Sequence, residues 1–113
     1  MTDDVADYYN TNTASFLRFG RGSRSTGTIH RALWGPGITS QRQALDFVHA
    51  RIIRALRDVV IQEGSGVRGQ PPLRPADLGC GVGASMVRIS TALNAEVGEV
   101  TISPVQQHHA QAR

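Results

Sequence analysis

Apolar residues recur at helical spacing in two stretches of the first half of the chain. The clearer stretch is residues 41–63, whose apolar positions are Leu45, Val48, Ile52, Leu56, Val59 and Val60. Ser40 can cap this stretch, and Gln43 stands three residues later, as a capping box requires. Residues 3–19 carry a looser pattern of the same period. The pattern therefore predicts two helices, the second with a well-defined start.

Glycine and proline interrupt this pattern in three places. Residues 20–27 are rich in glycine, serine and arginine, which predicts a flexible passage. Residues 29–34 are apolar but end at the Gly-Pro-Gly of residues 35–37, which predicts a loop or a short turn of helix. Residues 64–72 read as a linker. We divide the chain into a segment 1–39 and a domain part 40–113.

After the linker the pattern becomes that of an α/β unit. Residues 73–78 are predicted to form a short strand, and Pro75 should lie at its start because proline cannot donate to a strand ladder. Residues 84–93 show helical spacing, and residues 95–102 are predicted to form a second strand with apolar positions at Val97, Val100 and Ile102. The order strand, helix, strand predicts a β-α-β unit with parallel strands and a right-handed crossover. The fold class that follows is α/β.

A last helix is predicted to begin after residue 102. Ser103 can serve as its cap, and Pro104 suits its first position because proline has no N–H to lose there. Gln106 stands at the capping-box spacing from the serine. The chain therefore ends in a helix.

The turn between the first strand and its helix carries the candidate chemistry. Residues 77–83 read Asp-Leu-Gly-Cys-Gly-Val-Gly, with glycine at every second position after the acid. Such glycines let the backbone leave a strand sharply and approach a ligand closely. The N–H groups of the turn and the following helix start suit a carboxylate or phosphate. Asp77 can take a ligand ammonium or order a water. The plain alternative is that the glycines only make a tight turn.

A nicotinamide dinucleotide is a second interpretation of the same turn. Gly79, Gly81 and Ala84 satisfy the spacing G-x-G-x-x-[G/A], and Glu99 lies about 20 residues further on, where a ribose-binding acid is expected. Two features argue against it. The fingerprint strand of dinucleotide folds is usually near the domain start, and an acid just before the first glycine is not part of that fingerprint.

The same residues carry a family resemblance. Residues 77–83 resemble motif I of class I S-adenosylmethionine-dependent methyltransferases, and residues 100–106 resemble the end of their second strand and the next helix start. The threonine in the second segment, with glutamine five residues later, is similar to the group of cyclopropane-fatty-acid synthases and tocopherol or sterol methyltransferases. Residues 8–9, 16–20 and 29–34 resemble the N-terminal cap of bacterial small-molecule members. The resemblance implies an incomplete Rossmann-like fold: a helical cap plus the first β-α-β unit.

The resemblance also implies a site and a cofactor, S-adenosyl-L-methionine. Its methionine and ribose part would be lined by Asp77, Gly79, Cys80, Gly81 and Gly83. Its ribose and adenine would lie near Thr101, Ile102 and Gln106. Many class I enzymes have an acid at the position of Thr101, and Gln106 is the candidate to replace its contacts. The implied activity is methyl transfer to a small acceptor, for which a lipid- or terpenoid-like molecule is a candidate; no catalytic residue is assigned.

The composition limits which partners and which cellular compartment we expect for this chain. All 12 basic residues are arginine, they are spread along the chain, and the net charge is only +3, which gives little support to nucleic-acid binding. Cys80 is the single cysteine, which favours a reducing compartment. The N-terminus lacks a signal-peptide pattern, and no apolar run reaches the ~20 residues of a membrane span. The expectation is a cytoplasmic protein without integral membrane contact.

Other polar residues are weaker candidates. His108 and His109 are adjacent and so point to different helix faces, which disfavours a metal site. His30 can face a substrate, but a structural histidine is the simpler interpretation. Tyr8 and Tyr9 can close over a cofactor or merely pack. Cys80 has no base placed near it by sequence, so we expect a filler of the turn rather than a nucleophile.

Two expectations about the whole remain open. A two-stranded parallel sheet is marginal alone, and its first strand needs cover from a missing C-terminal half or another chain. Because doubly wound domains rarely fit in so few residues, we expect an N-terminal portion of a methyltransferase. The alternative is a catalytically inactive remnant or an interaction module.

Overall fold

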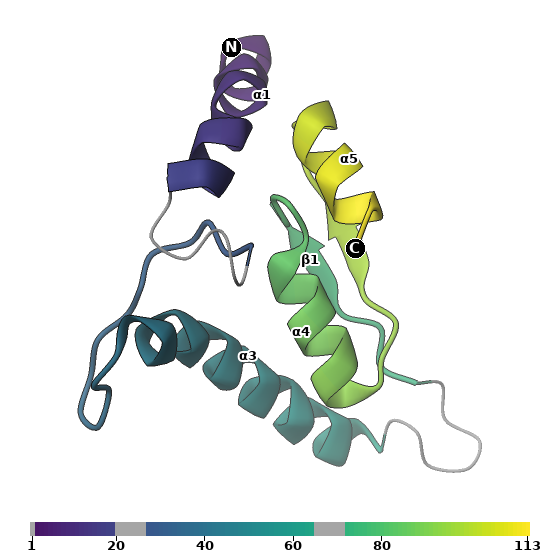
Figure 1. Ribbon diagram of the computed structural model, residues 1–113. Helices are drawn as coiled ribbons and strands as arrows, with labels where there is room; N and C mark the ends of the chain where they lie inside the picture. Colours follow the sequence, from purple (N-terminus) through teal and green to yellow (C-terminus); the bar gives the residue numbers. More distant parts are fainter. Residues whose placement is uncertain (1, 20–26, 65–71) are drawn as a thin grey trace.

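The computed structural model describes residues 2–19, 27–64 and 72–113. Its elements follow the order α1 (Thr2–Phe19), α3 (Gln41–Glu63), β1 (Ala76–Leu78), α4 (Ala84–Leu93), β2 (Gly98–Val100) and α5 (Pro104–Gln111). The flexible passage and most of the linker expected from the sequence lie outside the described residues. In Figure 1, α4 lies between α3 and the strands, and α5 runs beside α1.

Helix α3 begins and ends as the sequence predicts. The Ser40 side chain accepts from the Gln43 backbone N–H, and the Gln43 side chain accepts from the Ser40 backbone in return. The helix ends at Gly64, whose φ of 63° lies in the left-handed region that glycine tolerates. The start of its apolar stripe is covered best; Leu45 is buried, whereas Ile52 and Val59 are each 38% exposed.

The β-α-β unit is present with shorter strands than predicted. β1 and β2 pair in parallel with Ala76 opposite Gly98 and Leu78 opposite Val100. β1 is shorter than the predicted 73–78 because Pro75 has no N–H to donate, and β2 is shorter than the predicted 95–102 because only residues 98–100 pair with β1. Pro75 contributes only its carbonyl, which accepts from Gly98 at 2.8 Å. Helix α4 spans the predicted residues and joins the two strands.

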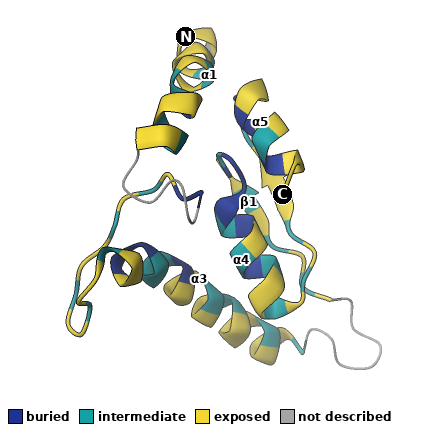
Figure 2. Cartoon of the chain, in the orientation of Figure 1, coloured by how far each residue is buried: buried dark blue, intermediate teal, exposed yellow. Residues whose placement is uncertain are grey.

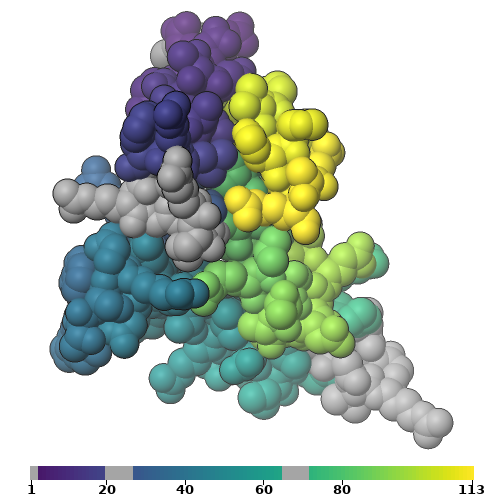
Figure 3. Space-filling model, in the orientation of Figure 1, coloured from purple at the N-terminus to yellow at the C-terminus, as the bar shows by residue number. Residues whose placement is uncertain are grey.

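The core gathers where the two halves of the chain meet. Helix α3 packs on α4, and α1 packs on α5; Figure 3 shows the surfaces of α1 and α5 adjoining. Buried residues concentrate around the start of α4, the start of α3 and the inner face of α5 (Figure 2). The buried apolar residues are Ala44, Leu45, Cys80, Val82, Ala84, Met86, Ile89 and Ala110.

The sheet keeps an uncovered apolar face within the described chain. Leu78 is 80% exposed, and Val100 and Ile102 are more than half exposed. Each sits at the carboxyl end of a strand or just beyond it. The described elements therefore leave open the region that a larger parallel sheet would cover.

Candidate functional site

The glycine turn, residues 79–83, leaves β1 in a conformation that glycine adopts readily. The φ angles of Gly79, Gly81 and Gly83 are 88°, 58° and 77°, all in the left-handed region. The Gly79 and Cys80 N–H groups both donate to the carbonyl of Val100, at 2.7 and 3.0 Å. The turn is therefore fastened to the end of β2 by its backbone.

The three glycines face different surroundings. A Cβ at Gly79 would meet nothing within 4 Å, and one at Gly81 would meet only Gln106 Oε1 at 4.0 Å. A Cβ at Gly83 would lie 3.0 Å from Ala110 Cβ and 3.1 Å from its Cα. The first two glycines thus border open space, whereas the third allows α5 to pack on the turn.

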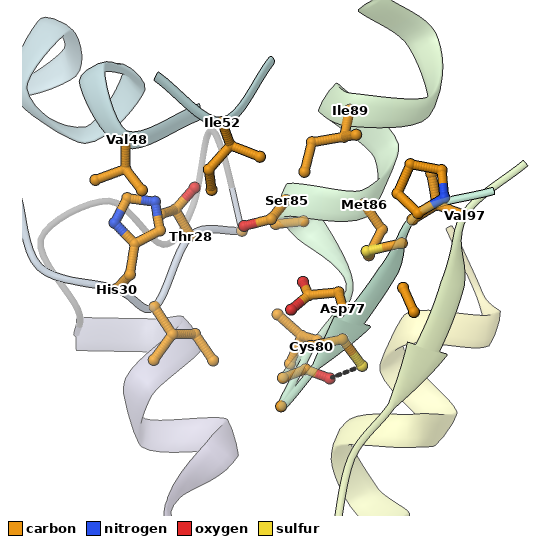
Figure 4. A pocket seen from close by; sticks show the side chains of 18 of the residues that line it. Thr28, His30, Val48, Ile52, Asp77, Cys80, Ser85, Met86, Ile89 and Val97 are labelled. Atoms are coloured by element: carbon orange, nitrogen blue, oxygen red, sulfur yellow. Dashed lines mark hydrogen bonds between the residues drawn. The ribbon is translucent and has the colours of Figure 1, made fainter. Parts of the chain in front are cut away.

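Two cavities meet at Gly79 and Gly81. The first, of about 420 Å³, lies between α3, α4, β1 and residues 27–30, and Asp77 and Cys80 line it (Figure 4). The second, of about 470 Å³, lies between Tyr9 of α1, the turn and residues 100–106. Ile29 and His30 line both cavities as well. Each volume falls within the ~300–1,000 Å³ typical of small-molecule sites.

The residues that the resemblance implies for the site divide between these cavities. Asp77 and Cys80 line the first, and Thr101, Ile102 and Gln106 line the second. Gly83 lines neither. Glu99, the acid of the dinucleotide interpretation, lines a separate hollow on the α5 side, of about 350 Å³.

A chain of hydrogen bonds connects residues that line the second cavity with the start of α5 and with α1. The Gln106 side chain is buried, and its Oε1 accepts from Thr101 Oγ1 at 3.3 Å. Ser103 caps α5 by accepting from the Gln106 N–H at 3.2 Å and donates its own hydroxyl to Asn10 Oδ1 at 2.6 Å. The predicted capping box at this helix is therefore wrong in its second half: the Gln106 side chain turns to Thr101 instead of the cap backbone.

Charge near the turn is set by two carboxylates and a buried thiol. Burial raises the pKa of Cys80, and the neighbouring carboxylates of Glu99 and Asp77 add to that shift. Its Sγ lies 3.7 Å from the Gly81 carbonyl, to which the thiol donates. A thiol kept protonated in this way is a poor nucleophile, which agrees with its expected role as a filler.

Ser85, which lines the first cavity opposite the turn, contacts a buried histidine, and the sequence analysis named neither residue. His49 of α3 is 1% exposed, and its Nε2 lies 2.9 Å from Ser85 Oγ in the first turn of α4. The rings of His49 and His30 meet edge-on with centroids 4.9 Å apart. The available signal was a histidine four residues after Leu45, inside the apolar stripe of α3.

Burial is the main cause of a lowered pKa at His49. The positive charges of a protonated His30 and of Arg88 lower it further, while Asp46 opposes them. Two buried side-chain nitrogens in the described part of the chain have no hydrogen-bond partner, His30 Nε2 and His49 Nδ1. We call His30, His49 and Ser85 the histidine–serine cluster.

The remaining candidates lie apart from the cavities, except Tyr9. Tyr8 packs edge-on against Tyr9 with ring centroids 5.4 Å apart. His108 and His109 lie on α5, with ring centroids 6.3 Å apart. Among the described residues, no group of three or more histidine, cysteine or acidic side chains converges as a metal site would require. In the same part of the chain, no helix has the length and apolar character needed to cross a membrane.

Comparison with protein-family models, curated proteins and solved structures finds no match to this chain. What the site can do therefore rests on its own chemistry. It offers a side-chain-free stretch of backbone between two cavities, an acid at the strand end and a buried polar cluster opposite.

Proposed function

We propose that this chain is the cofactor-binding part of an S-adenosylmethionine-dependent methyltransferase with a Rossmann-like fold. The observation that carries the proposal is the open space beside Gly79 and Gly81, where two cavities join at a turn leaving a parallel strand. A ligand with two parts can cross this turn and place one part in each cavity. The dimensions and the strand–turn–helix context fit that role.

The residues present fit the cofactor's charges. Asp77 lines the first cavity and suits the ammonium of the methionine part, while Gly79 and Gly81 allow close approach of the ribose. Thr101 and Gln106 line the second cavity with polar atoms for the ribose hydroxyls and adenine, beside the apolar Ile102. When bound, S-adenosylmethionine supplies a sulfonium-activated methyl group.

The rest of the chain would position an acceptor. The first cavity is lined mainly by apolar side chains of α3 and α4, among them Val48, Ile52, Met86 and Ile89. Such a lining favours a small, lipid- or terpenoid-like acceptor held next to the turn. Rate enhancement in this arrangement comes mainly from proximity and alignment of the acceptor atom with the methyl carbon.

Glu99 supports a methyl donor over a nicotinamide dinucleotide. A ribose-binding acid has to face the ligand that crosses the glycine turn. Glu99 instead lines the hollow on the α5 side, which Gly79 and Gly81 do not line, although that hollow shares Val100 and Thr101 with the second cavity. The polar residues beside the turn on the ligand side are Thr101 and Gln106.

A second candidate, an interaction module, is favoured by one observation. Leu78 and Val100 present apolar side chains on an uncovered part of the sheet within the described chain. Further strands of a longer protein, or another chain, would cover them. In this case the glycine turn is structural and binds no cofactor.

Isothermal titration calorimetry separates these functions. S-adenosylmethionine and NAD are each titrated into the full chain, and we expect micromolar binding of the first and none of the second.

Gly81→Val should weaken the binding at least about 100-fold, or roughly 2.7 kcal/mol, because its side chain fills the ligand's space. Gly37→Val is the matched control: Gly37 has a φ of 81° and nothing within 4 Å, but lines neither cavity. Equal affinity of both variants, or no binding by the wild type, contradicts the proposal.

A further inference from the structure

A line of polar groups runs from the first cavity into the interior. Ser85 lines the cavity beside the glycine turn (Figure 4), and its Oγ lies 2.9 Å from Nε2 of the buried His49. The His49 ring then meets His30 at 4.9 Å between centroids, with the planes 70° apart. Three elements contribute one residue each: α4, α3 and the segment before α3.

The hydrogen-bond pattern assigns the proton of His30. His30 Nδ1 lies 2.9 Å from the backbone oxygen of Arg31, and because a carbonyl can only accept, Nδ1 carries the proton. Neutral His30 then has a lone pair on Nε2, one of the two unpartnered buried nitrogens of the described chain. The other is His49 Nδ1, which makes no hydrogen bond to His30 Nε2. The relay requires the His49 proton to be on Nδ1, which leaves Nε2 as the acceptor facing the Ser85 hydroxyl at 2.9 Å.

We propose that Ser85 and His49 form a proton relay, with Ser85 as the catalytic residue that accepts a proton from a protic methyl acceptor and with the His30 ring packed against His49. The inference rests on the proposed function and deepens it, because it names the acceptor class: a hydroxyl or amine whose proton must leave. As the acceptor's oxygen or nitrogen forms its bond to the methyl carbon, its proton passes to Ser85 Oγ. The Ser85 proton passes to His49 Nε2, and the positive charge formerly on sulfur ends on the His49 imidazole.

The surroundings of the relay suit this direction of transfer. Ser85 is the second residue of α4, so the helix N-terminus stabilises negative charge that develops on its oxygen. The groups acting on His49 are His30 from its own segment, Arg88 from α4 and Asp46 from α3. Burial is the main cause of the lowered His49 pKa and the Arg88 charge adds to it, which favours an unprotonated ring that can accept near neutral pH.

Sulfonylation by phenylmethanesulfonyl fluoride tests the relay without a known acceptor. An activated serine attacks the probe's sulfur, the S–F bond breaks, fluoride leaves and the serine proton passes to His49. We expect mass spectrometry of the full chain to find the label on Ser85, at a rate that rises with pH as His49 deprotonates. His49→Gln should slow labelling at least tenfold, Ser85→Ala should abolish it, and Ser85→Thr should retain part of it. No label at Ser85, or a rate indifferent to His49, overturns the relay.

Nitrogen-15 NMR of the histidine rings provides a readout that does not depend on reactivity. The relay requires His49 to carry its proton on Nδ1 with Nε2 bare, and Ser85→Ala should shift the Nε2 resonance. A proton found on His49 Nε2 overturns the relay, because the ring would then donate to Ser85. Titration of S-adenosylmethionine into wild-type protein and Ser85→Ala distinguishes failure of the relay from failure of the proposed methyltransferase function. Labelling of wild-type Ser85 with no cofactor binding by either protein refutes methyl transfer and leaves the relay standing.

Discussion

The two sides of the first cavity are built in different ways. On the glycine side, consecutive residues of one turn are held by backbone hydrogen bonds to Val100. On the histidine side, the side chains of His30, His49 and Ser85 come from three separate elements and contact one another. We therefore expect added side-chain atoms to disturb the glycine side and protonation of a histidine ring to disturb the histidine side. Each prediction below disturbs one side and leaves the other intact.

The largest effect is expected from an added methyl group at the glycine turn. Gly83→Ala combines a φ of 77° with a contact of 3.0 Å to Ala110, so we expect a loss of about 2–4 kcal/mol in the free energy of unfolding. Gly79→Ala is the matched variant, since its φ of 88° carries similar backbone strain but its Cβ meets nothing within 4 Å. It should cost only about 1–2 kcal/mol. Urea denaturation measures both, and equal losses would contradict packing of α5 on the turn.

The histidine side should respond to acid. The His49 pKa is lowered in the folded chain, so below the usual value of about 6.5 the unfolded chain binds more protons than the folded one. The free energy of unfolding should therefore fall as the pH drops below about 6.5. His49→Gln should be about 1–3 kcal/mol less stable near pH 7, because its partner Ser85 loses a buried acceptor.

The pH dependence itself is the sharper measurement. Urea denaturation between pH 5 and 7.5 should give a shallower slope for His49→Gln than for the wild type. His108→Gln is the control, since His108 is exposed on α5 and lies in neither cavity. An unchanged slope in His49→Gln would mean that the acid sensitivity arises elsewhere.

The contrast between the sides also explains what could be predicted from the sequence. Helix α3, with its Ser40 cap, and helix α4 have the predicted bounds, because spacing and capping are local properties. The glycine turn is local too, and its three positive φ angles agree with the spacing of residues 77–83. These features needed no knowledge of what packs against them.

The features that were missed depend on distant parts of the chain. His49 and Ser85 are separated by α3 and β1 in sequence, and only the packing of α3 on α4 brings them within 2.9 Å. Gln106 has the spacing of a capping box, but a neighbouring Thr101 hydroxyl takes its side chain instead. The place of Gly83 against Ala110 likewise depends on where α5 packs. Spacing alone cannot rank such competing partners.

A smaller effect is expected where α1 meets the glycine side. Asn10 Oδ1 accepts from Ser103 Oγ at 2.6 Å and so links α1 to the cap of α5. Asn10→Ala should cost about 1 kcal/mol in the free energy of unfolding and should speed amide hydrogen exchange in α1. Asn12→Ala is the control, because the Asn12 amide donates to the Tyr8 carbonyl of its own helix. Faster exchange in both variants would show that α1 does not depend on α5.

The smallest effect on stability is expected at the ion pair that joins α3 to α4. Arg88 Nη1 lies 2.8 Å from Asp46 Oδ1, and both side chains are partly exposed, so Asp46→Asn should cost at most about 1 kcal/mol. The two members of the pair nevertheless act on His49 in opposite directions: the Asp46 carboxylate raises its pKa and Arg88 lowers it. NMR titration should therefore find a lower His49 pKa in Asp46→Asn and a higher one in Arg88→Gln.

Glu96→Gln, which breaks the exposed pair between Arg74 and Glu96, should leave the His49 titration unchanged. Shifts of the same sign in the two ion-pair variants would mean that loosening of α3 from α4, rather than charge, controls the ring, and the histidine side would then be as much a product of packing as the glycine side.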